Sequence, residues 1–433
     1  MSATTAPYAL TLTAAVAAIA EGRLTARELA ASQLARIAAT EPTIEAWQAL
    51  DPAQVLAQAQ QCDERRGDEA LAGIGIGVKD IIATADFATT MGSPIFAGHR
   101  PRVDAACIAR LRAAGGFVFG KTVTTPFAFM DPGKTHNPWH PAHTPGGSSS
   151  GSAAAVAAGH VIGAIGTQTN GSVIRPAAYC GIVGFKPTLD AIPFAGAHPF
   201  SATFDTIGTF ARNVDDAARL AATLADPGRI SPVLEPLSRA PRFAYVGDFP
   251  WTQLECDADD VVESAVTNLR TRAEVVPVDV PAQWHEANVA HRTIMLYEAA
   301  QNLSELQARE RERLTPALNA AIDEGRAISA SQYRDALGAR QRAIAFFTDW
   351  VAGFDAVLAP SAPGPAPKGL TTTGDPSCCT LWSLLGFPAL SLPVGMASGL
   401  PLGLQLAASQ GNDDRLLAVA RWCEARLPFR GLV

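Results

Sequence analysis

The sequence has little positive charge and no long apolar run. Its 433 residues include 34 lysines and arginines against 41 acidic residues, which gives a formal net charge of −7. Nucleic acid binding needs a concentrated basic surface, and the charges here are scattered, so we expect no nucleic acid partner. The longest apolar run beyond the N-terminus, residues 152–167, is short, is interrupted by His160 and is rich in alanine and glycine. It cannot span a bilayer, and we expect no membrane association.

The seven cysteines follow neither a zinc-binding nor a redox spacing. An odd number of cysteines in a long chain is typical of reduced thiols in the cytosol, so the adjacent Cys378 and Cys379 should be packed thiols rather than a disulfide. The apolar residues 1–20 are not preceded by lysine or arginine, unlike a secretory signal, and we interpret them as a first helix starting near Thr11 or Thr13. These features predict a cytoplasmic protein.

Short apolar segments of strand type alternate with helical segments along the chain. We expect buried strands at residues 74–78, 117–119, 161–167, 182–185, 243–246, 275–278, 356–359 and 390–394. We expect helices at residues 105–114, 153–158, 215–225, 258–272 and 413–425. The alternation predicts an α/β fold with a large mixed, mostly parallel β-sheet that is covered by helices on both faces.

The apolar content of 48% suffices for one continuous core, and no internal repeat divides the chain. We therefore expect a single domain, residues 1–433. Its parts would be an N-terminal helical layer (1–70), a catalytic core (71–225), a strand and helix segment with a helical insertion or lid (226–350), and a C-terminal return to the core sheet (351–433). Within the first layer, Thr25 and Glu28 form a capping box, and a second helix should cover residues 52–65. The charge-rich helical sequence at 284–350 suggests the insertion.

One motif, GGFVFGKT at residues 115–122, matches the nucleotide-binding P-loop letter for letter. A P-loop needs a flexible loop followed by a helix N-terminus. Here the interior is of strand type, and the sequence that follows, VTTP at 123–126, is a poor helix start. We therefore do not expect a nucleotide site.

Three histidines, His136, His140 and His143, fall within eight residues and could suggest a zinc hydrolase. The prolines among them prevent the helix that would bring their rings together. We favour a rigid loop with surface imidazoles, and we expect neither a metal ion nor another cofactor.

Two glycine-serine clusters, GGSSSGS at 146–152 and TNGSVIRP at 169–176, carry the chemistry. Glycine lets backbone N–H groups approach a reacting atom and serine supplies a nucleophilic hydroxyl, so the pair suggests acyl transfer. Such segments are often flexible linkers, but this one continues directly into an alanine-rich helix and a strand. No Gly-x-Ser-x-Gly elbow surrounds Ser172, so the base must come from elsewhere.

Lys79, in the apolar segment GIGVKD at residues 75–80, can supply that base. A neutral lysine amine can accept the proton of a serine through a second hydroxyl. The ordinary pKa of lysine is about 10.4, and burial among apolar residues would lower it by penalising the charged form. We therefore expect activity to rise toward alkaline pH.

These segments resemble the amidase signature family, whose hallmark is a Gly-Gly-Ser-Ser segment, a Gly-Ser segment before arginine and proline, and an upstream lysine. The similarity extends through GIVGFKPT at 181–188, GFP at 386–388 and GLPLGLQ at 399–405. It covers most of the chain, and the pattern is most similar to bacterial malonamidase-like amidases. The resemblance implies Ser172 as the nucleophile, Ser148, preceded by a cis peptide, as the proton relay, and Lys79 as the general base. The backbone N–H groups of Thr169, Asn170, Gly171 and Ser172 would then form the oxyanion hole.

The chain differs from the family at Gln168, where aspartate is common, and at Asn170, where glycine is usual. Asparagine tolerates left-handed backbone, so the turn can survive, and its side chain would lie beside the oxyanion hole. Arg175 resembles the arginine by which malonamidase holds a substrate carboxylate, but it could equally be part of a buried ion pair that supports the turn. We take Asn170, Ile174 and Arg175 as candidate substrate contacts.

The sequence thus predicts a serine hydrolase that cleaves a non-peptide amide, or a carbamate (urethane) or ester, through an acyl-enzyme. Its partner would be a small-molecule amide or carbamate substrate, aryl amides included, and the sequence leaves a homodimer open. One alternative is the amidase subunit of a tRNA-dependent amidotransferase complex, which shares these motifs. Another is a non-catalytic α/β binding protein.

Overall fold

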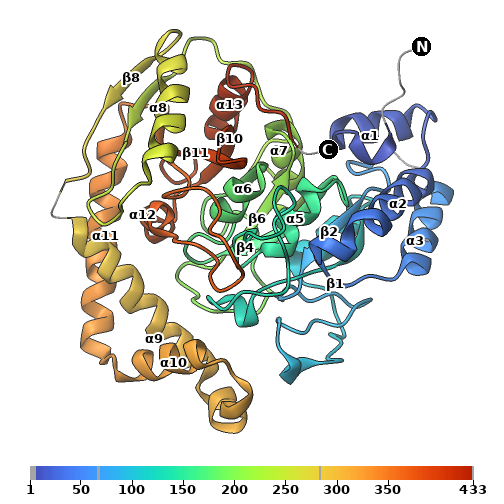
Figure 1. Ribbon diagram of the computed structural model, residues 1–433, viewed down its shortest axis with the longest axis horizontal. Helices are drawn as coiled ribbons and strands as arrows, with labels where there is room; N and C mark the ends of the chain where they lie inside the picture. The colour runs from blue at the N-terminus through green and yellow to red at the C-terminus, as the bar shows by residue number, and fades with distance from the viewer. Residues whose placement is uncertain (1–5, 66–68, 282–283, 432–433) are drawn as a thin grey trace.

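One eleven-stranded sheet runs through the protein, as shown by a computed structural model that describes the chain except residues 1–5, 66–68, 282–283 and 432–433 (Figure 1). The strand order is β1-β3-β2-β4-β6-β5-β10-β11-β9-β7-β8. The strands are β1 (Trp47–Ala49), β2 (Gly75–Lys79), β3 (Phe117–Thr122), β4 (Gly163–Gln168), β5 (Val183–Lys186), β6 (Thr206–Ala211), β7 (Arg242–Tyr245), β8 (Glu274–Pro277), β9 (Ala356–Pro360), β10 (Ala389–Ala397) and β11 (Leu400–Ala407). Every strand expected from the sequence is present, and the single large mixed sheet is confirmed.

The proportion of parallel pairs differs from the expected one. Six of the ten pairings among the described strands are antiparallel, and only β3-β2, β2-β4, β9-β7 and β7-β8 are parallel. The expectation of a mostly parallel sheet was wrong because β6 and β11 were not anticipated, and both pair antiparallel with their two neighbours. The link between β10 and β11 is the two-residue turn of Ser398 (φ 52°) and Gly399 (φ 79°), the left-handed pair that suits a tight hairpin.

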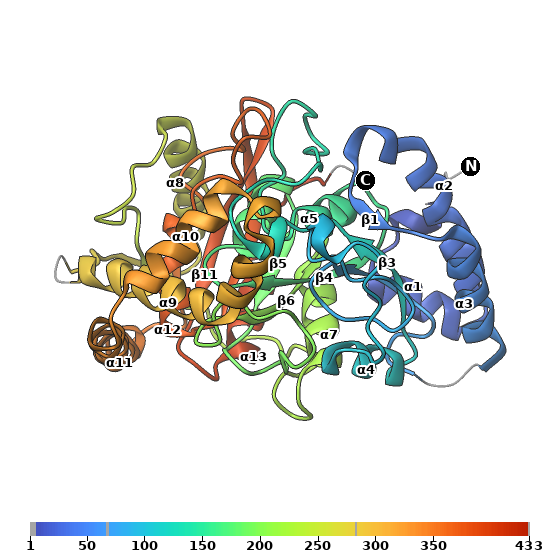
Figure 2. The ribbon, with the colours of Figure 1, turned by 90° about the horizontal axis from the view of Figure 1, so that it is seen from below.

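Helices cover both faces of the sheet. They are α1 (Leu12–Ala20), α2 (Ala26–Ile44), α3 (Pro52–Arg65), α4 (Ala106–Ala113), α5 (Ser150–Ala157), α6 (Ile174–Cys180), α7 (Val214–Leu224), α8 (Cys256–Arg270), α9 (His285–Glu310), α10 (Pro316–Ala327), α11 (Ala330–Val351), α12 (Ser377–Leu385) and α13 (Asp413–Glu424). Figure 2 shows α5 on one side of the strands and α7 and α13 on the other. Thr11 caps α1, and Thr25 with Glu28 forms the predicted capping box of α2.

The segment predicted to be a helical insertion forms three helices beside the sheet. Helix α9 packs against α10, α11 and α12, and α9 and α10 extend away from the sheet at the lower left of Figure 1. Helix α9 thus connects the insertion to α12. Helix α12 in turn contacts the loop that includes Asn170.

The fold contradicts a P-loop at residues 115–122. Residues 117–122 form the buried strand β3, and the short 3₁₀ turn Pro126–Ala128 follows it instead of a helix, so the P-loop geometry is absent. Among the described residues, no helix combines the length and apolar character that a membrane crossing requires.

Candidate active site

Lys79 ends β2, a strand in which every residue is buried. Its Nζ lies 2.7 Å from Ser148 Oγ, 2.8 Å from Thr167 Oγ1 and 3.5 Å from the Thr167 carbonyl oxygen. Thr167 belongs to β4, the parallel neighbour of β2, so the sheet itself holds the amine in place. The structure therefore brings the predicted base and the predicted relay into direct contact.

The environment of Lys79 favours its neutral form. The side chain is fully buried, and this burial lowers the pKa of Lys79 well below its usual range. The carboxylate of Asp205 acts in the opposite direction and raises the pKa, but by less than burial lowers it. The amine is thus prepared to accept a proton.

Ser148 follows a cis peptide bond, as the family resemblance implied. A side chain at Gly147 would meet Thr373 Cγ2 at 2.7 Å, so only glycine fits there. The preceding Gly146 has φ of 83°, in the left-handed region that glycine tolerates best. The fold thus requires glycine at these two positions of the first cluster, whereas a flexible linker would impose no such requirement.

The second cluster forms a turn of residues 169–173 between β4 and α6, which we call the nucleophile turn. Gln168 Oε1 accepts hydrogen bonds from the N–H groups of Val173 (2.8 Å) and Ile174 (3.0 Å), and Gln168 Nε2 donates to Ser383 Oγ (3.0 Å). The amide oxygen caps the N-terminus of α6, a role that carboxylate and amide oxygens fill equally well. Glutamine at position 168, where the family commonly has aspartate, therefore still supports the turn.

Asn170 is fixed by helix α12. Its Oδ1 accepts a hydrogen bond from Thr380 Oγ1 at 2.8 Å, and its carbonyl oxygen accepts one from the Ser383 hydroxyl. Asn170 is not among the residues with positive φ, so the left-handed backbone considered for it is not needed. The turn therefore accepts asparagine without strain.

A cavity of about 240 Å³ opens at this turn. Its wall includes the four residues predicted to form the oxyanion hole and also Arg175, together with apolar side chains such as Phe129, Phe200 and Met295. Among the described residues, none accepts a hydrogen bond from the backbone N–H of Thr169, Asn170, Gly171 or Ser172. Unsatisfied N–H groups beside a serine hydroxyl are what an oxyanion hole needs.

Arg175 links the two clusters. Its Nη2 donates to the Gly147 carbonyl oxygen at 2.7 Å and to Thr373 Oγ1 at 3.2 Å, while its buried Nε has no partner. Within the part of the chain that the structure describes, no carboxylate lies within 4.0 Å of the guanidinium, so the buried ion pair is not found. Arg175 instead lines the cavity, and the nearby carboxylate of Asp375 acts on the guanidinium without touching it.

Ile174, the third candidate substrate contact, lies elsewhere. It is fully buried in a hydrophobic cluster with Phe204 and Trp382, and it does not line the cavity. The helix that begins at Ile174 turns its side chain into the core while Arg175 faces the cavity.

The histidines of the proline-rich loop make hydrogen bonds to the backbone. His136 Nδ1 lies 2.6 Å from the Pro141 carbonyl oxygen, and His143 Nδ1 lies 2.7 Å from that of Ala366. Among the described residues, no group of three or more histidine, cysteine or acidic side chains could hold a metal ion.

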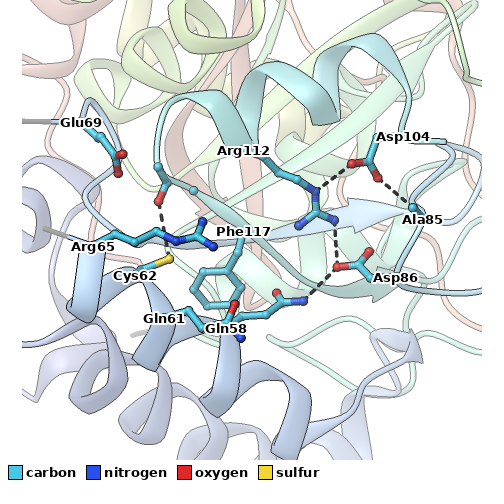
Figure 3. Close-up of a pocket in the computed structure, with 12 residues that line it drawn as sticks. Gln58, Gln61, Cys62, Arg65, Glu69, Ala85, Asp86, Asp104, Arg112 and Phe117 are labelled. Carbon is cyan, nitrogen blue, oxygen red and sulfur yellow. Dashed lines mark hydrogen bonds and ion pairs between the residues drawn. The ribbon is translucent and has the colours of Figure 1, made fainter. Parts of the chain in front are cut away.

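A second cavity, of about 390 Å³, lies between α3 and α4 (Figure 3). Arg112 in its wall pairs with both Asp86 and Asp104, at 2.8 Å each. Its one thiol, Cys62, has a pKa raised by burial, so it stays protonated and is a poor nucleophile. Among the described residues that line it, no nucleophile is paired with a base.

Several polar residues of the site were not expected from the sequence. Thr167, Asp205, His291, Thr380 and Ser383 contact either Lys79 or the nucleophile turn. The only available signal was the spacing of Thr380 and Ser383, which puts both hydroxyls on one face of a helix.

The family model for amidases matches residues 28–417. The chain belongs to the amidase family. A similar relative, a glutamyl-tRNA(Gln) amidotransferase subunit from Roseiflexus castenholzii, is 33% identical, and the alignment covers 95% of this chain and 94% of the relative. The corresponding subunit from Anaeromyxobacter sp. (strain K) is 35% identical over 96% of each chain.

Solved structures give the same assignment. The peptide amidase from Stenotrophomonas maltophilia superimposes with a TM-score of 0.83 at 30% sequence identity, covering 98% of each chain. An amidase-family fold and C–N bond hydrolysis thus fit both the sequence and the geometry of the site.

Proposed function

We propose that this amidase hydrolyses a small non-peptide amide, or a carbamate or ester, through an acyl-enzyme on Ser172. The proposal rests on the 2.7 Å contact between the buried amine of Lys79 and Ser148, and on a cavity lined by Ser172 and by turn residues whose N–H groups find no acceptor among the described residues. A base, a hydroxyl relay, a nucleophile and an oxyanion site are the components that acyl transfer requires.

The first step would transfer two protons and form one bond. Neutral Lys79 accepts the hydroxyl proton of Ser148, Ser148 accepts that of Ser172, and Ser172 Oγ attacks the substrate carbonyl carbon. The negative charge that develops on the carbonyl oxygen is stabilised by the N–H groups of the nucleophile turn. Thr167, which accepts hydrogen bonds from the Lys79 amine, leaves the nitrogen lone pair free to face Ser148.

The second step would break the C–N bond. The proton held by Lys79 returns through Ser148 to the leaving nitrogen, which departs as ammonia or an amine. Water then attacks the acyl-enzyme by the same route and releases the acid.

Arg175 supports a substrate that carries a carboxylate. Arg175 lines the cavity, its Nε finds no partner among the described residues, and burying a cation with no carboxylate in direct contact is costly. A carboxylate on the acyl group would supply the missing charge.

Replacing Arg175 by lysine tests this substrate class. Lysine keeps the charge but loses the planar fork, so KM for a carboxylated amide should rise about tenfold while KM for a neutral amide of the same size changes little. Steady-state kinetics on the matched pair measure the ratio. An equal change for both substrates would assign Arg175 to holding Gly147 alone.

Replacing Asn170 by glycine tests the other candidate contact. The side chain lines the cavity and binds Thr380, so its removal should widen the site and shift kcat/KM between small and bulky amides about fivefold. Kinetics over a panel of amides would detect the shift, and unchanged ratios would exclude a role of Asn170 in specificity.

The relatives support a second candidate, the amidase subunit of a tRNA-dependent amidotransferase, since both relatives described above are named as subunits of such an enzyme. The two functions differ in what the chain does alone. We would assay the purified chain with amides, anilides, carbamates, peptide amides and short carboxylated amides, with Ser172→Ala as the blank. Turnover by the chain alone supports the hydrolase, and turnover of glutamine only with partner subunits supports the second candidate.

A further inference from the structure

Thr169, at the start of the nucleophile turn, is held from two sides. Its Oγ1 donates to Asp205 Oδ1 at 2.5 Å, and its carbonyl oxygen lies 3.1 Å from His291 Nε2. Asp205 precedes β6 and His291 belongs to α9, so both contacts come from segments remote in sequence. Neither residue takes part in the proposed chemistry.

His291 reaches the turn in a fixed orientation. It is fully buried, and its ring stacks on Phe204 with a centroid separation of 4.5 Å. Burial lowers the pKa of His291 to about 4, so the ring is neutral near pH 7. A carbonyl oxygen can only accept a hydrogen bond, so Nε2 of the neutral ring carries the hydrogen and donates a hydrogen bond to the Thr169 carbonyl oxygen.

The carboxylate of Asp205 joins the turn to the loop of residues 200–205. Its Oδ2 accepts from the N–H groups of Phe200 (2.7 Å) and Ser201 (3.0 Å). Glu298, seven residues after His291 on α9, accepts from Ser201 Oγ at 2.6 Å and from the Thr203 N–H at 3.0 Å. Helix α9, this loop and the nucleophile turn thus form one hydrogen-bonded unit.

Because the peptide bond is planar, a contact with a carbonyl oxygen also sets the direction of the N–H group of the next residue. In a trans peptide the carbonyl of one residue and the N–H of the next point in opposite directions. The bond from His291 to the Thr169 carbonyl therefore fixes the direction of the Asn170 N–H. The Ser383 hydroxyl, which donates to the Asn170 carbonyl, fixes the Gly171 N–H in the same way.

We propose that His291 and Ser383 are positioning residues that aim two successive N–H groups of the nucleophile turn at the developing oxyanion. The role rests on the proposed function, because it needs Ser172 to form a tetrahedral intermediate. Helices α9 and α12 thereby contribute to the site, since each supplies one donor to a backbone carbonyl of the turn. Donation to a carbonyl also polarises the peptide and strengthens the N–H as a donor.

A pair of variants at His291 separates orientation from packing. His291→Leu removes the donor at similar volume and should lower kcat about tenfold, less than the loss of an oxyanion donor itself, with KM within twofold of the wild type. His291→Gln keeps an N–H at a comparable reach and should restore most of kcat. Ser383→Ala should match the leucine variant and provides a second reading if His291→Leu does not fold.

Two further measurements complete the test. Tyr333→Phe removes a 2.6 Å bond to Glu298 in the same unit without touching the turn, and it should leave kcat within twofold. The rate at which a fluorophosphonate labels Ser172 should fall with kcat in the leucine and alanine variants. Equal impairment of His291→Leu and His291→Gln, or wild-type kcat in both His291→Leu and Ser383→Ala, would overturn the proposal. An inactive wild type would instead refute the proposed function.

Discussion

Replacing Ser172 by alanine is expected to lower kcat by about 10⁴-fold or more, the scale seen when a serine nucleophile is removed. Ser172 lines the cavity, stands beside N–H groups for which the described part of the chain offers no acceptor, and is the residue of the turn that the proposal assigns to bond formation. Alanine differs by one oxygen atom, so the fold should persist. Steady-state amide hydrolysis and covalent labelling by a fluorophosphonate measure the loss, and both signals should disappear together.

Ser150 offers a matched control for Ser172. It belongs to the other glycine-serine cluster, where its hydroxyl donates to the Val123 carbonyl oxygen at 3.4 Å, a weak bond. Ser150→Ala should therefore keep kcat within about twofold, since a surplus hydroxyl contributes little to the transition state. Substantial turnover by Ser172→Ala beside a normal Ser150→Ala would move the nucleophile to another residue.

The sequence predicted the strands whose residues form continuous apolar runs and missed those whose runs are interrupted by glycine or proline. Segments such as residues 74–78 and 356–359 indicate strands because they are continuous apolar runs. Strands β6 and β11 contain glycine, and β11 also proline, which weaken the local strand signal. Each of them pairs antiparallel with both of its neighbours, so missing them hid most of the antiparallel pairs.

The residues of the candidate site also fall into two groups, those that stand in a sequence motif and those that do not. Lys79, Ser148 and Ser172 stand in motifs that are visible in a single sequence, and the structure puts the first two in contact. Asp205 and His291 stand in no motif, because each acts through a partner that is 36 or 122 residues away. Only the fold brings such residues together, so their contacts with the turn could not be predicted from the sequence.

Replacing Lys79 by methionine is the second prediction with a large effect. Methionine fills similar space without a basic nitrogen, and loss of the general base should lower kcat by about 10³-fold, within the range for such groups. The wild-type pH profile provides the matching evidence. Lys79 acts as a base only when neutral, so kcat/KM should rise with pH through its pKa, and burial puts this acidic limb well below the ordinary lysine value. The residual activity of Lys79→Met should lack that limb.

The burial of Lys79 also predicts that Lys79→Met, which should lose activity, gains stability. Between the lowered pKa of the folded protein and the ordinary lysine pKa of about 10.4, the unfolded chain protonates Lys79 whereas the folded chain holds it neutral, so folding must release a proton at a cost in free energy. Lys79→Met avoids this cost and should be more stable than the wild type near pH 7. The difference in free energy of unfolding should shrink as pH rises toward the ordinary pKa, where both states hold a neutral amine. Chemical denaturation across this pH range measures it. A difference in free energy of unfolding that does not change with pH would mean that Lys79 is charged in the folded protein and cannot be the base.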